Sequence, residues 1–544
     1  MTHGLLHGII TNGLLKSIGL AGMLLLLMAS CTTQRRLTRL DQEVAGLLDQ
    51  AQQIQFGEEI EPERLDIDGY TPFVPGEDGD ALSLDLRKAL ELAARHSREY
   101  QTAKETLYLS ALSLRSAQHS WEWNPTNNLS ALLGIKQNPS ETTFSTDSSL
   151  GFSKRLLSGG RIAGSLALST LRYFSGDHSV SMQTIANLTV NQPLLRGSGA
   201  LVAREPLTQA ERNLIYALRH YVRTREALLI TIADLYYDVL NAGADLRVAE
   251  QSLASFQYSA QRSEAMGEFG GKVTQIDIGQ ARQRVLTAES NLVTCQANLR
   301  SAKDRLKIAL AIPLDLEITV DAADMQDLLT KPLPSPQFTL DEAIALALSQ
   351  RLDLATQQDQ LADAERAIRI AEDDMRAEVN LTGSATARSA RRNRLSTPRL
   401  GDAEYSVGLD IDLPLDRTEE TIALRRAQIA RQRQQRAVSA TQDEIVQALR
   451  GTWVDLEAYA RRVEIQKLSV QLAEQRVENS RMLFEDGRIA IRDYLDAQDD
   501  LSDARNSLTR QLVAHRMSWL RLLYQLDELN VDAQTLWTER LEMN

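Results

Sequence analysis

The chain has 544 residues, of which 43% are hydrophobic but only 5% aromatic, with 13 Pro and 28 Gly. Its 73 acidic residues outnumber 60 basic ones, so the formal net charge is -13, which argues against a general nucleic-acid binder. Two cysteines and seven histidines leave little material for a disulfide framework or a histidine-rich metal site. The low proline and glycine content favours long helices over disorder.

The first thirty residues are typical of an export signal. Lys16 precedes an apolar run from Ile18 to Met28, which has the length of a signal h-region and is too short to span a bilayer. Ala29 and Ser30 then lead to Cys31, and this segment resembles the lipobox of bacterial lipoproteins. The resemblance implies that Cys31 is diacylated and carries a lipid anchor, and Thr32 after it favours the outer membrane. An ordinary signal peptide with an incidental Cys31 is the alternative.

Three sequence matches recur in the same order in the two halves of the chain. The first match begins in both halves with a residue able to cap a helix and continues into an alanine-rich helical pattern. We therefore predict one structural design used twice. The matched segments are residues 85–93 with 339–347, residues 191–195 with 412–415, and residues 271–277 with 487–493.

The repeat predicts how the chain is organised. Each copy should run as helix, strands, very long helix, short turn and long helix, and Pro332, Pro334 and Pro336 should mark the linker between copies. The expected segments are a lipoprotein signal peptide (1–30), a lipid-anchored tether (31–82), the first repeat (83–330), the linker (331–337), the second repeat (338–528) and a C-terminal tail (529–544).

Apolar residues that alternate at spacings of four and three predict helices wound around neighbours. The first long helix should run from about Arg204 to Gly267, and sixty helical residues reach roughly 90 Å, more than any compact domain. Cys295 lies in such a seam, so we expect a small buried hydrophobe rather than a reactive thiol. The seam residues are Leu228, Ile232, Leu235, Val239, Ala242, Leu246, Ala249, Leu253 and Phe256, then Val285, Ala288, Leu292, Cys295, Leu299, Ala302, Leu306 and Ala309, and in the second copy Val446, Leu449, Trp453, Leu456, Ala460 and Val463.

Other segments alternate with period two and have lengths of about nine to eleven residues, which suit a transmembrane β-barrel. Counted as two strands per copy, four strands per chain cannot close a barrel. An open edge in lipid would leave unpaired backbone groups, so several chains should share one barrel. The predicted strands are Asn128–Ile135, Ser149–Leu157, Ile185–Leu195, Val379–Ala387 and Tyr405–Leu413, with a possible additional strand at Ile162–Ser169.

These features together resemble the TolC-like outer membrane efflux family. The resemblance rests on the lipobox, the doubled layout, the Gln192-Pro193-Leu194-Leu195-Arg196-Gly197 run and the paired Gly-x-x-x-x-x-Asp-x-x-x-Ala turns, and it extends from about Leu84 to Leu526. It implies an α+β membrane protein in which three protomers form a twelve-stranded transmembrane β-barrel, continuous with a long periplasmic α-helical coiled-coil barrel.

The resemblance also implies a function. The chain would be the outer membrane exit duct of a tripartite efflux or type I secretion system, passing small molecules or polypeptides to the exterior. Its partners would be two further copies of itself, a periplasmic adaptor protein, an inner-membrane pump of proton-driven or ABC type, and outer membrane lipid.

The paired turns are the candidate site. Glycine suits a tight turn between helices because it adopts positive φ. The resemblance places these turns at the periplasmic tip, where they would contact the adaptor, and it implies that Asp493 and Asp496 line a constriction that favours cations. The alternative for each aspartate is a first-turn carboxylate stabilised by the helix dipole, worth about 0.3–1 kcal/mol, and for Asp277 we prefer that alternative. The implied adaptor-contact residues are Gly271, Val273, Thr274, Gly487, Ile489 and Ala490.

The family also closes this tip with salt bridges that involve an arginine. Arg488 and Arg492 lie nearby but out of register with the usual position. The gating partners therefore cannot be assigned from the sequence.

Enzymatic interpretations find no support in the sequence. It contains no phosphate-binding glycine loop, no His-Glu-x-x-His and no Gly-x-Ser-x-Gly. We therefore expect no catalytic activity, no metal, and no cofactor beyond the covalent lipid on Cys31. A structural periplasmic coiled-coil lipoprotein without a pore remains the alternative, although it would not need the alternating strands. An adaptor, with one helical hairpin and lipoyl-like β-domains, fits the doubled design poorly.

Overall fold

The structure, a computed structural model, describes residues 35–56, 82–137, 140–173, 180–270, 273–321, 323–390, 396–413, 415–486, 488–532 and 534–538. The expected signal peptide and Cys31 lie outside the described residues. The chain divides into two compact units, and each takes segments from both halves of the sequence. Unit 1 comprises Met1–Leu65, Thr106–Leu218 and Arg366–Gln428, and unit 2 comprises Asp66–Glu105, Arg219–Glu365 and Ile429–Asn544.

Helices make up most of the described chain. The two longest, α4 and α9, have 71 and 68 residues, so each is about 100 Å long. The helices of the first half are α2 (Leu86–His96), α3 (Arg98–His119), α4 (Ala200–Gly270) and α5 (Gln275–Leu310), followed by the short α6 (Ala323–Thr330). Those of the second half are α7 (Leu340–Gln350), α8 (Leu352–Asp374), α9 (Thr418–Glu485) and α10 (Ile491–Gln525).

None of the described helices is both long enough and apolar enough to cross a membrane.

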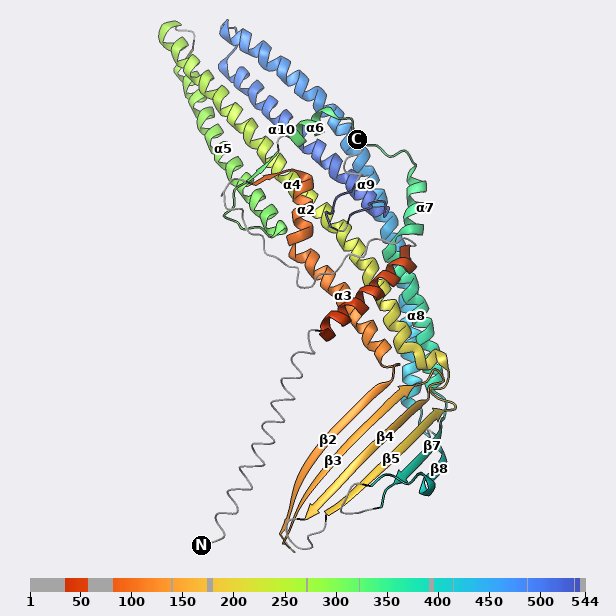
Figure 1. Cartoon of the computed structure of the whole chain (residues 1–544). Coiled ribbons are helices and arrows are strands. Elements are labelled where there is room, and N and C mark those ends of the chain that lie inside the picture. The colour runs from red at the N-terminus through yellow and green to blue at the C-terminus, as the bar shows by residue number, and fades with distance from the viewer. Residues whose placement is uncertain are drawn as a thin grey trace, which may run out of the picture. The chain divides into compact units, whose positions relative to one another are not determined.

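The main feature of unit 1 is an antiparallel sheet of six strands in the order β2-β3-β4-β5-β7-β8 (Figure 1). The single turn of the 3-10 helix η2 (Leu400–Asp402) precedes its last strand. The strands are β2 (Asn124–Gln137), β3 (Ser140–Arg155), β4 (Arg161–Tyr173), β5 (Val180–Pro193), β7 (Glu378–Arg388) and β8 (Glu404–Asp412).

The predicted count of two strands per copy is wrong for the first copy. Each predicted segment lies largely within a strand, including the possible one at Ile162–Ser169, so the six-stranded sheet takes four strands from the first half of the chain and two from the second. A barrel of twelve strands from three chains assumes four strands per chain, and this sheet has six. The expected count of four strands per chain is therefore wrong, and the size of the barrel stays a prediction.

Unit 1 also contains a helix over residues 35–56, within the segment expected to be a lipid-anchored tether. The Arg115 Nε of α3 donates to Glu43 Oε2 of this helix at 2.6 Å, and the Tyr108 hydroxyl donates to Asp41. The first part of the segment is thus a helix that packs on α3.

Unit 2 is helical, with a small parallel pair of strands, β1 (Leu82–Leu84) and β6 (Ile318–Val320). Every predicted seam residue is buried or half-buried, so the heptad interpretation is confirmed. The helices α2 and α7 begin as predicted, because Asp85 and Thr339 accept hydrogen bonds from the backbone N–H groups of Lys88 and Glu342. Half-buried Cys295 has a pKa raised by burial, which disfavours the reactive thiolate.

A buried ionic cluster ties the end of α10 to α4 in unit 2. Asp527, with φ of 55°, follows the last turn of α10, and its Oδ2 accepts from the Leu352 backbone N–H at 2.9 Å. Arg223 of α4 donates to the Asp527 carboxylate, to the Tyr524 carbonyl at 2.7 Å and to Glu226 Oε2 at 3.3 Å. One guanidinium therefore serves three acceptors, two of them carboxylates.

Candidate functional site

The sheet of unit 1 has one apolar and one polar face. Residues paired across antiparallel strands share a face, and one such row runs Phe152, Gly164, Leu188, Ala385 and Tyr405. The large side chains of this face are exposed, with Leu129 at 74% and Val407 at 82%. Its members include Leu129, Leu133, Phe144, Leu150, Phe152, Leu166, Leu188, Val190, Leu381, Tyr405, Val407, Leu409 and Ile411.

The opposite face is mainly polar. The row next to the apolar one runs Thr126, Gly151, Ser165, Asn187, Thr386 and Glu404, and it crosses all six strands. Leu132, Leu171 and Ile185 are apolar exceptions on this face. An exposed sheet with one apolar and one polar face is typical of a barrel wall between lipid and water.

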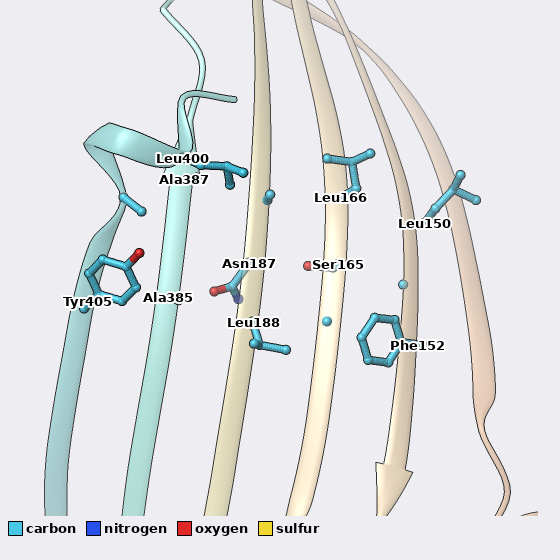
Figure 2. Close-up of a pocket in the computed structure, with 14 residues that line it drawn as sticks. Leu150, Phe152, Ser165, Leu166, Asn187, Leu188, Ala385, Ala387, Leu400 and Tyr405 are labelled. Atoms are coloured by element: carbon cyan, nitrogen blue, oxygen red, sulfur yellow. The ribbon is translucent and has the colours of Figure 1, made fainter. Parts of the chain in front are cut away.

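The 3-10 helix η2 shapes a groove on the apolar side. The groove has a volume of about 510 Å³, and Leu400 of η2 lies with Leu150, Phe152, Leu166 and Leu188 along it (Figure 2). The side chains that the apolar face and η2 contribute to its lining are apolar, apart from the Tyr405 hydroxyl. Its chemistry suits a hydrocarbon chain.

The Gln192–Gly197 run lies at one end of the sheet, where it contacts the turn between β3 and β4 and residue Asp373. Gln192 accepts from the Ser158 hydroxyl at 2.6 Å, and its amide donates to the Ser158 carbonyl at 3.1 Å, which fixes the turn between β3 and β4. The Gly197 N–H, at φ of 75°, donates to buried Asp373 at 2.7 Å. The run that carried the family resemblance therefore has a local structural role.

The two helical turns in unit 2 form the second part of the site. Gly271 and Gly487 lie outside the described residues. Val273 and Ile489 are half-buried, and Ile489 packs against a cluster that joins α4, α5, α9 and α10. In this cluster Phe484 and Tyr494 stack at 5.8 Å between ring centroids.

The two turns differ in how they cap the following helix. Thr274 and Asp277 form a reciprocal capping box at the start of α5, which confirms the structural role preferred for Asp277. Ala490 occupies the corresponding position before α10 and has no side chain that can cap. Asp493, the counterpart of Asp277, is exposed, and no cation lies within 4.0 Å of it among the described residues.

Asp496 takes part in an ionic pair that the sequence did not reveal. Arg284 of α5 donates to Asp496 at 2.7 Å and also lies 2.7 Å from Asp499, while Arg492 lies 4.0 Å from Asp496. Burial raises the pKa of Asp499, and Arg284 opposes this shift. Arg284 thus bridges two carboxylates of the neighbouring helix near the turns.

No sequence signal identifies Arg284, because 212 residues separate it from Asp496. The sequence left the gating partners unassigned, because Arg488 and Arg492 are out of register with the usual arginine. Arg488 has no ion pair within 4.0 Å in the described ranges, and Arg492 makes only the long contact to Asp496. In the described portion of the chain, no group of three or more His, Cys, Asp or Glu residues is arranged to hold a metal ion.

Comparison with known proteins agrees with this architecture. Residues 343–526 match the sequence model of the outer membrane efflux protein family. Nodulation protein T of Rhizobium leguminosarum bv. trifolii is 23% identical over 299 residues, which are 52% of this chain and 60% of that protein. The chain therefore spans about three fifths of this relative's length.

Solved structures extend the likeness in fold to most of the chain. The outer membrane protein VceC from Vibrio cholerae superposes with a TM-score of 0.60 at 17% identity, covering 81% of this chain and 95% of VceC. The Campylobacter jejuni CmeC outer membrane channel gives a TM-score of 0.60 at 14% identity, covering 81% of this chain and 85% of CmeC. At these identities the likeness concerns the fold.

Proposed function

We propose that this chain belongs to the TolC-like outer membrane efflux family and is a subunit of a trimeric exit duct in the bacterial outer membrane; the match of residues 343–526 to the family model and the likeness in fold to solved outer membrane channels support this proposal. The duct would carry small molecules or polypeptides from an inner-membrane pump, of proton-driven or ABC type, to the exterior. Export of this kind involves no covalent chemistry, so the function needs no catalytic residue or cofactor.

The two-faced sheet is the observation that carries this proposal. Its apolar face would contact lipid and its polar face would line water, and the groove beneath Leu400 would accept an acyl chain of the outer membrane. Strands β2 and β8 are the edges of the sheet. An open edge in lipid is unfavourable, so further copies of the chain would close the wall.

The remaining assignments follow from membership in the family. The two halves would be copies of one repeat, within the boundaries predicted from the sequence, and Cys31 would anchor the chain through a covalent lipid. The helical turns would contact the periplasmic adaptor through Gly271, Val273, Thr274, Gly487, Ile489 and Ala490. Asp493 and Asp496 would line the constriction of the tunnel, and Arg284 would hold α5 and α10 together beside it.

Conductance tests this function. The full-length protein, purified from outer membranes in detergent, should be a trimer and should produce discrete current steps in planar bilayers, unlike a mock preparation from cells lacking the gene. Because a closed tip would restrict current, Arg284→Ala should be measured in parallel, and we expect larger steps from it. Folded trimers of both proteins without channel activity would refute the duct and favour the coiled-coil lipoprotein.

A further inference from the structure

We propose that all six strands of each chain belong to the barrel wall, so that a trimer forms an eighteen-stranded barrel rather than a twelve-stranded one. This inference rests on the proposed trimeric duct. It concerns the partner at each sheet edge, a second copy of this chain, and the width of the opening that the copies enclose.

The continuity of the sheet is the first argument. In the first copy, β2, β3, β4 and β5 pair in order without a break in register, and β5 then pairs with β7 of the second copy. The paired segments of β3 and β4 include Thr143 with Tyr173 and Arg155 with Arg161, so they run nearly the full length of both strands. These two strands lie inside the sheet and are not an appendage at its edge.

The second argument is that β3 and β4, the two strands that a four-stranded contribution would lack, have one apolar and one polar face like the other strands. On the apolar side, Leu150 of β3 pairs with Leu166 of β4, which pairs with Ala186 of β5. On the polar side, Ser149 pairs with Ala167, and Asp147 with Ser169. A hairpin folded into the lumen would meet water on both sides and would have no need for an exposed apolar face.

Close packing holds these strands together. A Cβ on Gly164 of β4 would lie 2.5 Å from Cζ of Phe152, so the Phe152 ring of β3 covers this glycine. A Cβ on Gly151 would lie 2.9 Å from the Gly164 carbonyl oxygen. The ring of Phe152 also meets Trp123 edge-on, with 5.4 Å between centroids. Glycine at position 164 leaves room for the Phe152 ring, and glycine at position 151 allows the close approach of the β4 backbone.

The turn between β3 and β4 is fixed as well. Its Ser158 exchanges two hydrogen bonds with Gln192 of β5, and the Ser158 carbonyl accepts from the Gly199 N–H at 3.1 Å. Gly159 has φ of 90°, and a Cβ there would lie 2.3 Å from the Gly197 carbonyl oxygen. The hairpin is thus held in the sheet at its turn as well as along its strands.

An even number of strands allows closure. Each neighbouring pair of the sheet is antiparallel, so β2 and β8 run in opposite directions and β8 of one chain can pair with β2 of the next in antiparallel fashion. Barrel diameter grows roughly linearly with strand number, so eighteen strands give an opening about one and a half times as wide as twelve. For a strand spacing of about 4.8 Å and a tilt of about 40°, the backbone radius would be about 18 Å rather than about 12 Å.

Electron microscopy of the full-length trimer in lipid nanodiscs tests the inference. The matched variant deletes Ser140–Tyr173, which removes β3 and β4 and leaves β2 antiparallel to β5. We expect six strands per subunit in the native wall and four in the variant, with a native wall about one and a half times as wide. A conducting native trimer with four strands per subunit in its wall would overturn this inference alone, whereas the absence of any closed barrel would overturn it together with the duct.

A second measurement does not depend on the deletion folding. In a Cys295→Ser background, Ser149→Cys and Leu150→Cys place a thiol on the polar and the apolar face of β3. A membrane-impermeant maleimide should modify the first and lower the conductance of reconstituted channels, and it should leave the second unmodified. Equal modification of both would mean that β3 lies outside the wall, and would contradict the inference.

Discussion

At the residue scale, the buried Arg223 cluster makes stability depend on pH. Burial raises the pKa of Glu226 to about 8 from its ordinary 4.5, the charge of Asp527 raises it further, and Arg223 opposes the shift. Because the folded pKa lies above the unfolded one, the stability that Glu226 contributes is complete below about pH 4.5 and is lost as the pH rises through about 8. Burial beside a second carboxylate therefore favours the protonated form of Glu226 below about pH 8.

Glu226→Gln tests this directly, since the amide resembles the neutral acid. Each pH unit between the two pKa values costs at most about 1.4 kcal/mol in the native protein, and the substitution removes this cost. We expect equal Tm values near pH 5 and a Tm higher by several degrees for the variant at pH 9. Glu250→Gln, at an exposed position of the same helix, is the control and should match the native protein at both values. A variant less stable at pH 9 would show that the carboxylate is charged and needed.

Individual residues also differ in whether the sequence reveals their partners. The capping residues Asp85, Thr274 and Thr339 act on neighbours three positions away, so a local pattern is enough to identify them. Arg284 and Arg223 instead donate to carboxylates that are far away in the sequence and are brought close by helix packing. No local pattern encodes such a partner.

At the element scale, the long helices were predictable because a seam repeats many times. The strands were harder to count. On the apolar side of β3, Thr146 and Ser148 lie between Phe144 and Leu150, so alternation is clear only in the second half of the strand. The pattern therefore indicates Ser149–Leu157, whereas the strand spans Ser140–Arg155. Backbone pairing with β2 and β4 extends β3 beyond what its side chains predict.

The two faces of β8 predict opposite responses to charge. Leu409 is 56% exposed on the apolar face, and Asp410 beside it is on the polar face. If the apolar face meets lipid, Leu409→Arg costs about 2–4 kcal/mol per subunit near the bilayer midplane, while Asp410→Arg meets water. We expect the yield of heat-resistant trimer in outer membranes to collapse for the first variant and to stay native for the second. Equal yields would contradict the assignment of the faces.

At the scale of the whole molecule, the net charge of -13 is not spread evenly. On α10, Asp493, Asp496, Asp500 and Asp503 recur at spacings of three and four, so they share one side of the helix. Asp496 is partly neutralised by Arg284, whereas Asp493 is exposed. Threefold repetition of this stripe around a tunnel would concentrate negative charge at one level, as the charged rings of cation channels do.

Replacing Asp493 and Asp496 by asparagine should therefore weaken cation selectivity. With a salt gradient across a planar bilayer, we expect the reversal potential to move toward zero and the cation-to-anion permeability ratio to fall at least roughly twofold. Asp443→Asn with Glu444→Gln removes the same charge from exposed positions of α9 and should leave the ratio unchanged. If both double variants shift the potential equally, the selectivity comes from overall charge, and if neither does, the two aspartates serve only the first turn of α10. A selective loss in the first variant alone would assign the constriction to this turn, where exposed Asp493 lies one turn from Asp496, which is held by Arg284 of the neighbouring helix.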